Sequence, residues 1–485
     1  MKIWRLLFDP RGTISRVQFA LTALILVALK IAGDFAIAQL LFHRTWNLHE
    51  YFFSHLTFLF DNSPGIWKLD AALLLWAAPF AWMGLSLLAK RLRSAKAPIP
   101  LVILFFVPVA KFFLFALLCV LPDALYNGRS QPLTRLHRWV PESALASATL
   151  AVVCSILVGV GFALLATQQM RDYSTWLFLG LPFLMGFLAA WIHGLARPRK
   201  LWQSLGVAYL ALAITGAILL SIAVEGIVCL VMAAPIALCE ATVGGWIAHS
   251  IRRTSWPNAS GTSTVAAACL ALPLLIALES LTTIWPTEFA VTSELSINAP
   301  PEIVWRHVIS FHELPPPKEW IFRLGVSYPQ RAEIDGKGAG ALRHCIFSTG
   351  EFLEPITNWD EPNSLCFDVV AQPDPLSELS PYRNLRPPHL QGYFKSHRGA
   401  FHLYPTNRGT LLLGTTWYSN RMEPQFYWKL WSDALIHRIH IRVLEQIKRE
   451  AEAKMGVLTP SHNQEIVHSS PNEISHLQKH RPDGQ

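Results

Sequence analysis

The stretch FAVTSELSINAPPEIVWRHVISFHELP, residues 289–315, decides the fold of the C-terminal part of the chain. Alternate side chains from Val291 to Ile297 are apolar or small, which is the pattern of one face of a half-buried strand. Pro300 and Pro301 then favour the start of a helix, where a missing N–H costs nothing. We therefore expect a strand that leads directly into a helix.

Further strands and one long helix are expected downstream. Short apolar runs alternate with turn sequences such as GKGAG at 336–340, and no helix N-terminus follows GKGAG. This glycine-rich segment therefore predicts a hairpin turn and not a phosphate-binding loop. A helix over about 424–454 closes the region. The expected strands are 342–348, 351–359, 364–370, 398–404 and 411–418.

This order of elements resembles the START-like SRPBCC superfamily, whose members have the helix-grip fold. The resemblance rests on a strand that ends in Asn-Ala-Pro, a following helix with Val-Trp, a strand meander and a long C-terminal helix, and it covers about 288–454. It implies an antiparallel sheet wrapped on the C-terminal helix around an apolar cavity. It also implies hydrophobic-ligand binding or a polyketide cyclase type of activity.

The first 286 residues have a different character. The chain of 485 residues is 52% hydrophobic and 15% charged, whereas about a quarter of a typical soluble protein is charged. About 20 helical residues cross the hydrocarbon layer of a bilayer. We therefore expect an all-α polytopic membrane region of seven or eight helices, followed by a soluble α+β helix-grip domain. The apolar runs are 17–42, 69–89, 99–122, 143–166, 174–196, 203–223, 226–248 and 265–285.

The chain is expected to divide into four segments. The N-terminal residues 8–125 resemble a family of small bacterial inner-membrane proteins of unknown function, marked by a Gly-Arg-x-x-Arg motif and a basic Arg-Leu turn. Here Gly12-Thr13 begins the motif and Arg93-Ser94 stands where His-Asp is usual. The resemblance implies location alone. The segments are an N-terminal membrane domain (1–128), further transmembrane helices (129–286), the START-like domain (287–455) and a polar tail expected to be disordered (456–485).

The net charge of +8 lies largely in short loops between apolar runs, where it sets membrane orientation and gives no argument for nucleic acid. If all eight runs cross the membrane and the N-terminus is cytoplasmic, the loops on the cytoplasmic side carry 9 Lys and Arg residues and those on the other side carry 10. If the run 99–122 dips and returns, the split becomes 16 inside and 3 outside. Because basic loops favour the cytoplasm, we favour the second arrangement, which puts the C-terminal domain on the periplasmic face.

Several ionisable residues fall within or beside the expected spans, where they cost several kcal/mol unless they are paired or face a cavity. Lys30 and Asp34 are four residues apart and are expected to pair. Glu225 and Glu279 lie near span ends and are expected to reach headgroup water. For Glu240, a role in an ion or substrate pathway remains an alternative. The full set is Lys30, Asp34, Lys111, His193, Glu225, Glu240 and Glu279.

The closing helix carries WSDALIHRIHIRVLEQIKREAE at 431–452. At about 100° per residue, Asp433, His437 and His440 project from the middle of its apolar face, opposite an arginine-lined side. An acid and two imidazoles on a buried face need hydrogen-bond partners. We therefore expect all three side chains to point into the grip.

Three interpretations of these side chains are open. In the first, they form a structural network, in which Asp433 accepts from His437 one turn on or the side chains tie the helix to strand residues such as Arg343, Thr416 or Tyr418. In the others, they supply polar contacts to a ligand, or they serve catalysis or metal binding. The Pro-rich segment 373–394 is a candidate gate over the cavity. Other side chains expected at the cavity are Trp305, Trp359, Tyr382, His389, Tyr393, Trp417 and Tyr427.

The sequence thus predicts an integral protein of the bacterial inner membrane whose C-terminal domain binds a lipid or isoprenoid-like ligand for sensing or transfer. The alternatives are a membrane-anchored cyclase or dehydratase-like enzyme, with His437 or His440 as general acid/base oriented by Asp433, and a non-enzymatic scaffold. A binding role is favoured over catalysis. The expected partners are membrane lipids and a hydrophobic small molecule, with no nucleic acid, no cofactor and no metal.

The two cysteines of the C-terminal region, Cys345 and Cys366, are predicted to be free thiols. In a three-stranded meander their strands lie two spacings apart, about 9.6 Å. A disulfide needs Cα atoms within about 7 Å. The oligomeric state is not predicted.

Overall fold

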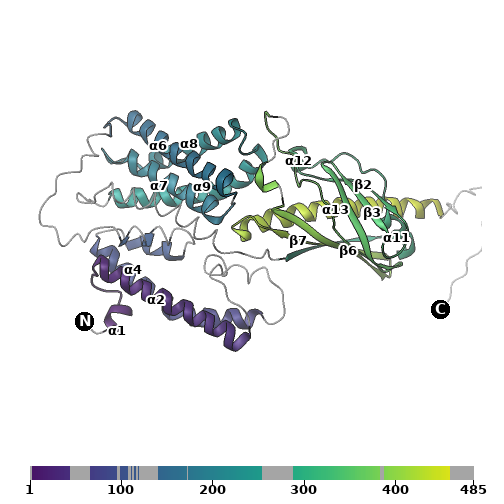
Figure 1. The fold of residues 1–485 in the computed structure, drawn as a ribbon, viewed down its shortest axis with the longest axis horizontal. Helices are drawn as coiled ribbons and strands as arrows, with labels where there is room; N and C mark the ends of the chain where they lie inside the picture. The colour runs from purple at the N-terminus through teal and green to yellow at the C-terminus, as the bar shows by residue number, and fades with distance from the viewer. Residues whose placement is uncertain are drawn as a thin grey trace, which may run out of the picture.

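The computed structural model describes residues 3–43, 66–95, 99–106, 140–171, 173–253, 288–382, 387–390 and 392–458, together with residues 111, 114, 115, 118 and 119. These ranges hold ten α-helices and one seven-stranded sheet. Six of the ten helices are long and apolar enough to cross a membrane, where seven or eight crossings were expected. Figure 1 shows the helices of residues 3–253 on one side and the sheet, together with the remaining helices, on the other.

Six of the eight expected apolar runs are confirmed as long helices within the described ranges. The run 99–122 is described only in part and begins with a 3-10 helix, and 265–285 lies outside the described residues, as do Glu279 and the tail from 459. The helices are α1 (Ile3–Leu7), α2 (Arg16–Ala36), α4 (Ile66–Ser94), α6 (Ala144–Leu164), α7 (Leu181–His193), α8 (Leu201–Ser221) and α9 (Ile227–Arg253). Short segments are η1 (Ile37–Leu41), η2 (Ile99–Phe106), η4 (Leu165–Met170) and η5 (Trp176–Gly180).

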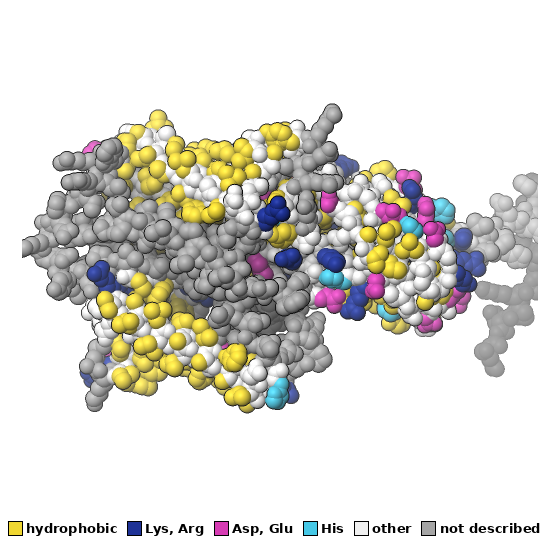
Figure 2. Space-filling model, viewed as in Figure 1, with side chains coloured by type: hydrophobic (Ala, Val, Ile, Leu, Met, Phe, Trp, Pro, Cys, Tyr) yellow, Lys and Arg dark blue, Asp and Glu magenta, His cyan; other side chains and the backbone are white. Residues whose placement is uncertain are grey.

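Helix α7 is the buried centre of the group α6 to α9. Its close contact with α9 depends on glycine: a Cβ at Gly186 would lie 2.2 Å from the Ala241 carbonyl oxygen, and one at Gly244 would lie 2.1 Å from that of Phe183. Small residues at such contacts are typical of helices that pack in membranes. Hydrophobic side chains cover much of the described helical surface, whereas charged side chains gather over the sheet (Figure 2).

The C-terminal part is one antiparallel sheet with the strand order β1-β7-β6-β5-β4-β3-β2. All six strands expected from the sequence are present, and GKGAG forms the turn between β2 and β3, as predicted. Residues Cys345 and Cys366 are free thiols, also as predicted. The strands are β1 (Glu288–Ile297), β2 (Pro329–Asp335), β3 (Leu342–Phe347), β4 (Gly350–Asp360), β5 (Ser364–Asp368), β6 (Phe394–Thr406) and β7 (Gly409–Asn420).

Strand β2 and the short helix α12 (Trp320–Arg323) were not expected from the sequence. In β2, charged Arg331, Glu333 and Asp335 alternate with only two apolar side chains, so the run does not read as a core strand. Its place at the sheet edge explains this composition, because charges protect an edge from pairing with other chains.

Helix α13 (Gln425–Leu458) runs from the helical part across the sheet (Figure 1). It packs on β1 and β7 and on α11 (Pro301–Ile309), which follows β1 as the sequence predicted. Val304, Leu412 and Leu444 meet in this core and are each 0% exposed. A half-barrel of antiparallel strands closed by a long C-terminal helix is the helix-grip architecture that the sequence predicted.

Candidate functional site

A cavity of about 210 Å³ lies between the inner face of the sheet and helix α13. Most of its wall is apolar and includes Phe347, Phe352, Phe367, Ile436 and Ile439. Residues from the segment 372–393 and two residues of α9, Cys229 and Met232, complete the wall. The helical part therefore supplies one side of the cavity of the C-terminal domain.

The cavity also has a polar wall made by Arg343 on β3 and Glu354 on β4. These residues are direct cross-strand partners, and the guanidinium donates to the carboxylate. The guanidinium carbon also lies 5.5 Å from the centre of the Phe367 ring. Burial is the largest single influence and opposes the charge of Arg343, but Glu354 and Cys345 together outweigh burial and raise the pKa of Arg343.

The side chains of His437 and His440 share Ser293 on β1 as a hydrogen-bond partner, at 2.7 Å and 3.1 Å from their Nδ1 atoms. His440 uses its Nε2 as well, at 2.7 Å from the Thr416 hydroxyl on β7. Burial lowers the pKa of His440 to about 4, with His437 as a smaller cause, so His440 is neutral near pH 7. These contacts tie α13 to two strands.

Asp433 completes the same connection, because the Tyr418 hydroxyl on β7 donates to its carboxylate at 2.6 Å. Lys429 pairs with Asp433 from the helix itself. Thr416 and Tyr418 are thus among the strand partners that the sequence named. The expectation that all three side chains point into the grip holds only in part for His437: its Nδ1 atom reaches Ser293 on the edge strand β1, but the residue as a whole is exposed.

Three of the ten residues expected at the cavity line it: His389, Tyr393 and His440. Trp305 lies in the core against Trp359, with ring centres 5.6 Å apart, and Trp417 stacks against Arg398. Asp433, His437, Trp305, Trp359, Tyr382, Trp417 and Tyr427 are not part of the cavity wall. Ligand contact by any of the ten remains a prediction.

Three tyrosines join the C-terminal domain to the helical part through hydrogen bonds to backbone carbonyls. Tyr382 donates to Ser221, Tyr393 to Arg171 and Tyr427 to Met232. The segment 373–394, the candidate gate, takes part in the same junction, since the Leu379 carbonyl accepts from the Ile227 amide at 3.1 Å. This segment therefore lies between the cavity and the ends of α8 and α9.

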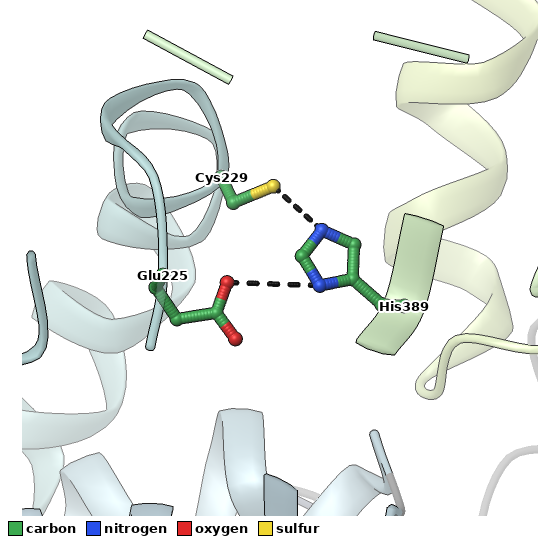
Figure 3. Close-up of side chains that lie close together, drawn as sticks. All are labelled: Glu225, Cys229 and His389. Carbon is green, nitrogen blue, oxygen red and sulfur yellow. Dashed lines mark hydrogen bonds and ion pairs between the residues drawn. The ribbon is translucent and has the colours of Figure 1, made fainter. Parts of the chain in front are cut away.

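A second cluster lies at this junction: Glu225, just before α9, Cys229 in its first turn, and His389 in the short helix η6 (Pro388–Leu390). The Cys229 Sγ atom is 2.8 Å from Nε2 of His389, and the Glu225 carboxylate is 3.6 Å from Nδ1 of the same ring (Figure 3). The Tyr173 hydroxyl donates to Glu225 at 2.8 Å.

Two of the three side chains of the cluster are buried, and Cys229 is partly buried. Glu225 is 8% exposed and His389 is 5% exposed. Burial raises the pKa of Glu225 to about 8 and lowers that of His389 to about 4. The expectation that Glu225 reaches headgroup water is therefore wrong, because the segment 373–394 covers this end of the helical part.

The remaining ionisable residues of the helical part are distributed along it. Lys30 and Asp34 form the expected pair at 2.5 Å, and His193 is 3.1 Å from the Ser147 hydroxyl. Lys111 and Glu240 are half-buried. None of the described residues hydrogen-bonds the Oε2 atom of Glu240.

Comparison with known proteins gives likenesses of fold alone. No family model matches the chain, so the resemblance of residues 8–125 to a family gains no support, and no curated protein matches. Three solved structures are similar to the C-terminal part.

A point mutant of norcoclaurine synthase from Thalictrum flavum is 13% identical, with 36% of this chain and 99% of that chain covered and a TM-score of 0.24. A protein of Nitrosospira multiformis is 18% identical, and the match covers 35% of this chain and 99% of that chain with a TM-score of 0.24. The di-domain ARO/CYC StfQ from the steffimycin biosynthetic pathway is 9% identical, with 40% and 59% covered and a TM-score of 0.25. At these TM-scores the likenesses carry no argument about what the chain binds or does.

Proposed function

We propose that this is an integral membrane protein whose helix-grip domain binds a hydrophobic small molecule that carries a polar group. The observation that supports this most is the cavity of about 210 Å³, which is largely apolar and is walled on one side by Cys229 and Met232 of a membrane helix. A concave apolar site with a few polar groups is the usual form of a small-molecule site.

The ion pair of Arg343 and Glu354 supports a ligand with a polar end. Both residues line the cavity, and their polar atoms are among those able to fix the orientation of a bound molecule on a largely apolar wall. We therefore propose an amphiphilic ligand, of the lipid or isoprenoid-like class, with its polar group toward these two strands and its apolar body along α13.

The enzymatic alternative has less support. Both ring nitrogens of His440, the histidine of the helix cluster that faces the cavity, are engaged with the hydroxyls of Ser293 and Thr416. A general acid or base needs a nitrogen within reach of the substrate proton. We therefore favour binding over catalysis at this site.

The proposal is tested by native mass spectrometry of the full-length protein, purified in mild detergent, beside two matched variants. Val369→Trp fills the cavity, whereas Val370→Trp adds the same bulk at the next residue, which is 66% exposed and outside the cavity wall. We expect a lipid-sized adduct on the wild-type protein and on Val370→Trp, and its loss on Val369→Trp. An adduct retained equally by all three, or absent from all three, would overturn the proposal.

A further inference from the structure

The cluster at the junction brings together the side-chain types that bind transition metals. One donor atom each from Glu225, Cys229 and His389 lies within 4.8 Å of the other two. Glu225 precedes α9 and Cys229 lies in its first turn, whereas His389 comes 160 residues after Cys229 in the chain. Thiolate, imidazole and carboxylate are the ligands that zinc prefers in proteins.

A fourth residue, Glu378, provides a second and independent indication. It is 9% exposed, and its carboxylate lies against the first turn of α9, beside the Cys229 thiol. Among the described residues, no group makes a hydrogen bond of standard geometry with either oxygen of Glu378 or with Nδ1 of His389, although the Cys229 thiol and the amides of Val228 and Cys229 lie close to the Glu378 carboxylate. Polar atoms buried to this degree cost free energy when they lack partners.

The charges of the cluster also favour a cation. Glu225 and Glu378 are close enough to act on each other. Among the described residues, the groups that act on them are the Tyr173 hydroxyl, the Cys229 thiol and backbone amides, none of which is a cationic side chain. One divalent ion replaces the protons of the buried Glu225 carboxyl and Cys229 thiol, which are released to solvent, and accepts a lone pair from each of them and from the neutral imidazole.

We propose that Cys229, His389 and Glu225 bind a divalent transition-metal ion of the zinc type, with Glu378 as the adjoining carboxylate. Such an ion joins the first turn of a membrane helix to the segment that covers the cavity. It therefore fastens the C-terminal domain to the helical part, whatever molecule the cavity holds.

The first experiment titrates full-length protein in detergent, stripped with a chelator and then dialysed, with Zn²⁺ alone. We expect one equivalent to bind tightly, and Co²⁺ in its place to give the absorption bands of thiolate coordination. Cys229→Ser and His389→Gln are each expected to weaken Zn²⁺ binding by at least about 100-fold, the upper end of what loss of an outer-shell partner costs. The thiolate bands are expected to disappear in Cys229→Ser.

The matched control is Cys239→Ser, which removes an exposed thiol from the same helix and is expected to leave both signals unchanged. Wild-type protein that binds neither ion stoichiometrically, or thiolate bands that persist in Cys229→Ser, would overturn the proposal. If Cys229→Ser fails to fold, the wild-type titration and His389→Gln decide the question. Because the readout is metal content, a negative result here leaves lipid binding in the cavity as a separate question.

Discussion

The guanidinium of Arg343 donates to the carboxylate of Glu354 across neighbouring strands, and the two residues are only 2% and 6% exposed. Truncation of one partner by Glu354→Ala leaves a charged guanidinium buried without its acid. We expect a loss of about 3–5 kcal/mol in the free energy of unfolding, measured by denaturant titration of the detergent-solubilised protein.

The double variant Arg343→Met/Glu354→Met is the control for this pair, because it replaces both charges with apolar groups. We expect it to be more stable than Glu354→Ala. If the double variant is the less stable of the two, the unpaired buried guanidinium is not the cause of the stability lost in Glu354→Ala.

The neutral state of His440 makes stability depend on pH. Its pKa is lowered to about 4 from 6.5, so the unfolded chain takes up a proton first as the pH falls, and stability is complete above pH 6.5 and lost toward pH 4. Between pH 7 and pH 5 this amounts to about 2 kcal/mol. We expect the change in thermal midpoint over this range to be smaller in His440→Gln than in the wild type.

A matched control for the pH experiment is His402→Gln, since His402 lies outside the cavity wall. It is expected to keep the pH dependence of the wild type. An unchanged pH dependence in His440→Gln would show that His440 is protonated equally in the folded and unfolded chain.

The hydrogen bonds of three tyrosines to the helical part are expected to slow local opening at the junction between the helical part and the C-terminal domain. Replacing Tyr382, Tyr393 and Tyr427 together by Phe removes three hydroxyls, each worth about 1 kcal/mol. We expect faster hydrogen exchange in residues 387–393 and in the first turns of α13, with unchanged exchange in the β6–β7 ladder. Tyr404→Phe, at a tyrosine that is 51% exposed on β6, is expected to change neither.

The distribution of basic residues predicts the side of the membrane on which the C-terminal domain lies. Arg199 and Arg252 hydrogen-bond the carbonyls of Glu142 and Leu195 at the ends of α6 to α9 away from the sheet, whereas Arg171 lies at the end that meets it. Since basic ends favour the cytoplasm, we predict a periplasmic C-terminal domain. An alkaline phosphatase fusion at the C-terminus should be active and a green fluorescent protein fusion dark; the reverse pattern contradicts this orientation.

Much of the fold could be predicted from local patterns. The alternation from Val291 to Ile297 marked β1, and the apolar runs marked six described helices, because burial on one side imposes a period on the sequence. Strand β2 was missed because an edge strand needs few apolar residues. His437 was placed too deeply because a helical phase gives a direction but not where the covering sheet ends.

The candidate sites were less accessible to sequence reasoning. His389 and Tyr393 were named for their chemistry, but nothing local indicated that a loop histidine meets Cys229 at the start of a membrane helix. Glu225 and Cys229 are four residues apart, which is the signal available in the sequence; their partner comes from tertiary packing. The Arg343 and Glu354 pair had a clearer signal, as each occupies an inward position on an alternating strand.

The wall that α9 lends to the cavity has a practical consequence. A soluble fragment that begins at β1 would keep all seven strands and α13 but would lack Cys229 and Met232, so its cavity would stand open to water where those side chains belong. Ligand affinities measured on such a fragment would therefore refer to a cavity with an incomplete wall. The proposed binding unit therefore includes residues of α9, one of the six described helices that are long and apolar enough to cross a membrane.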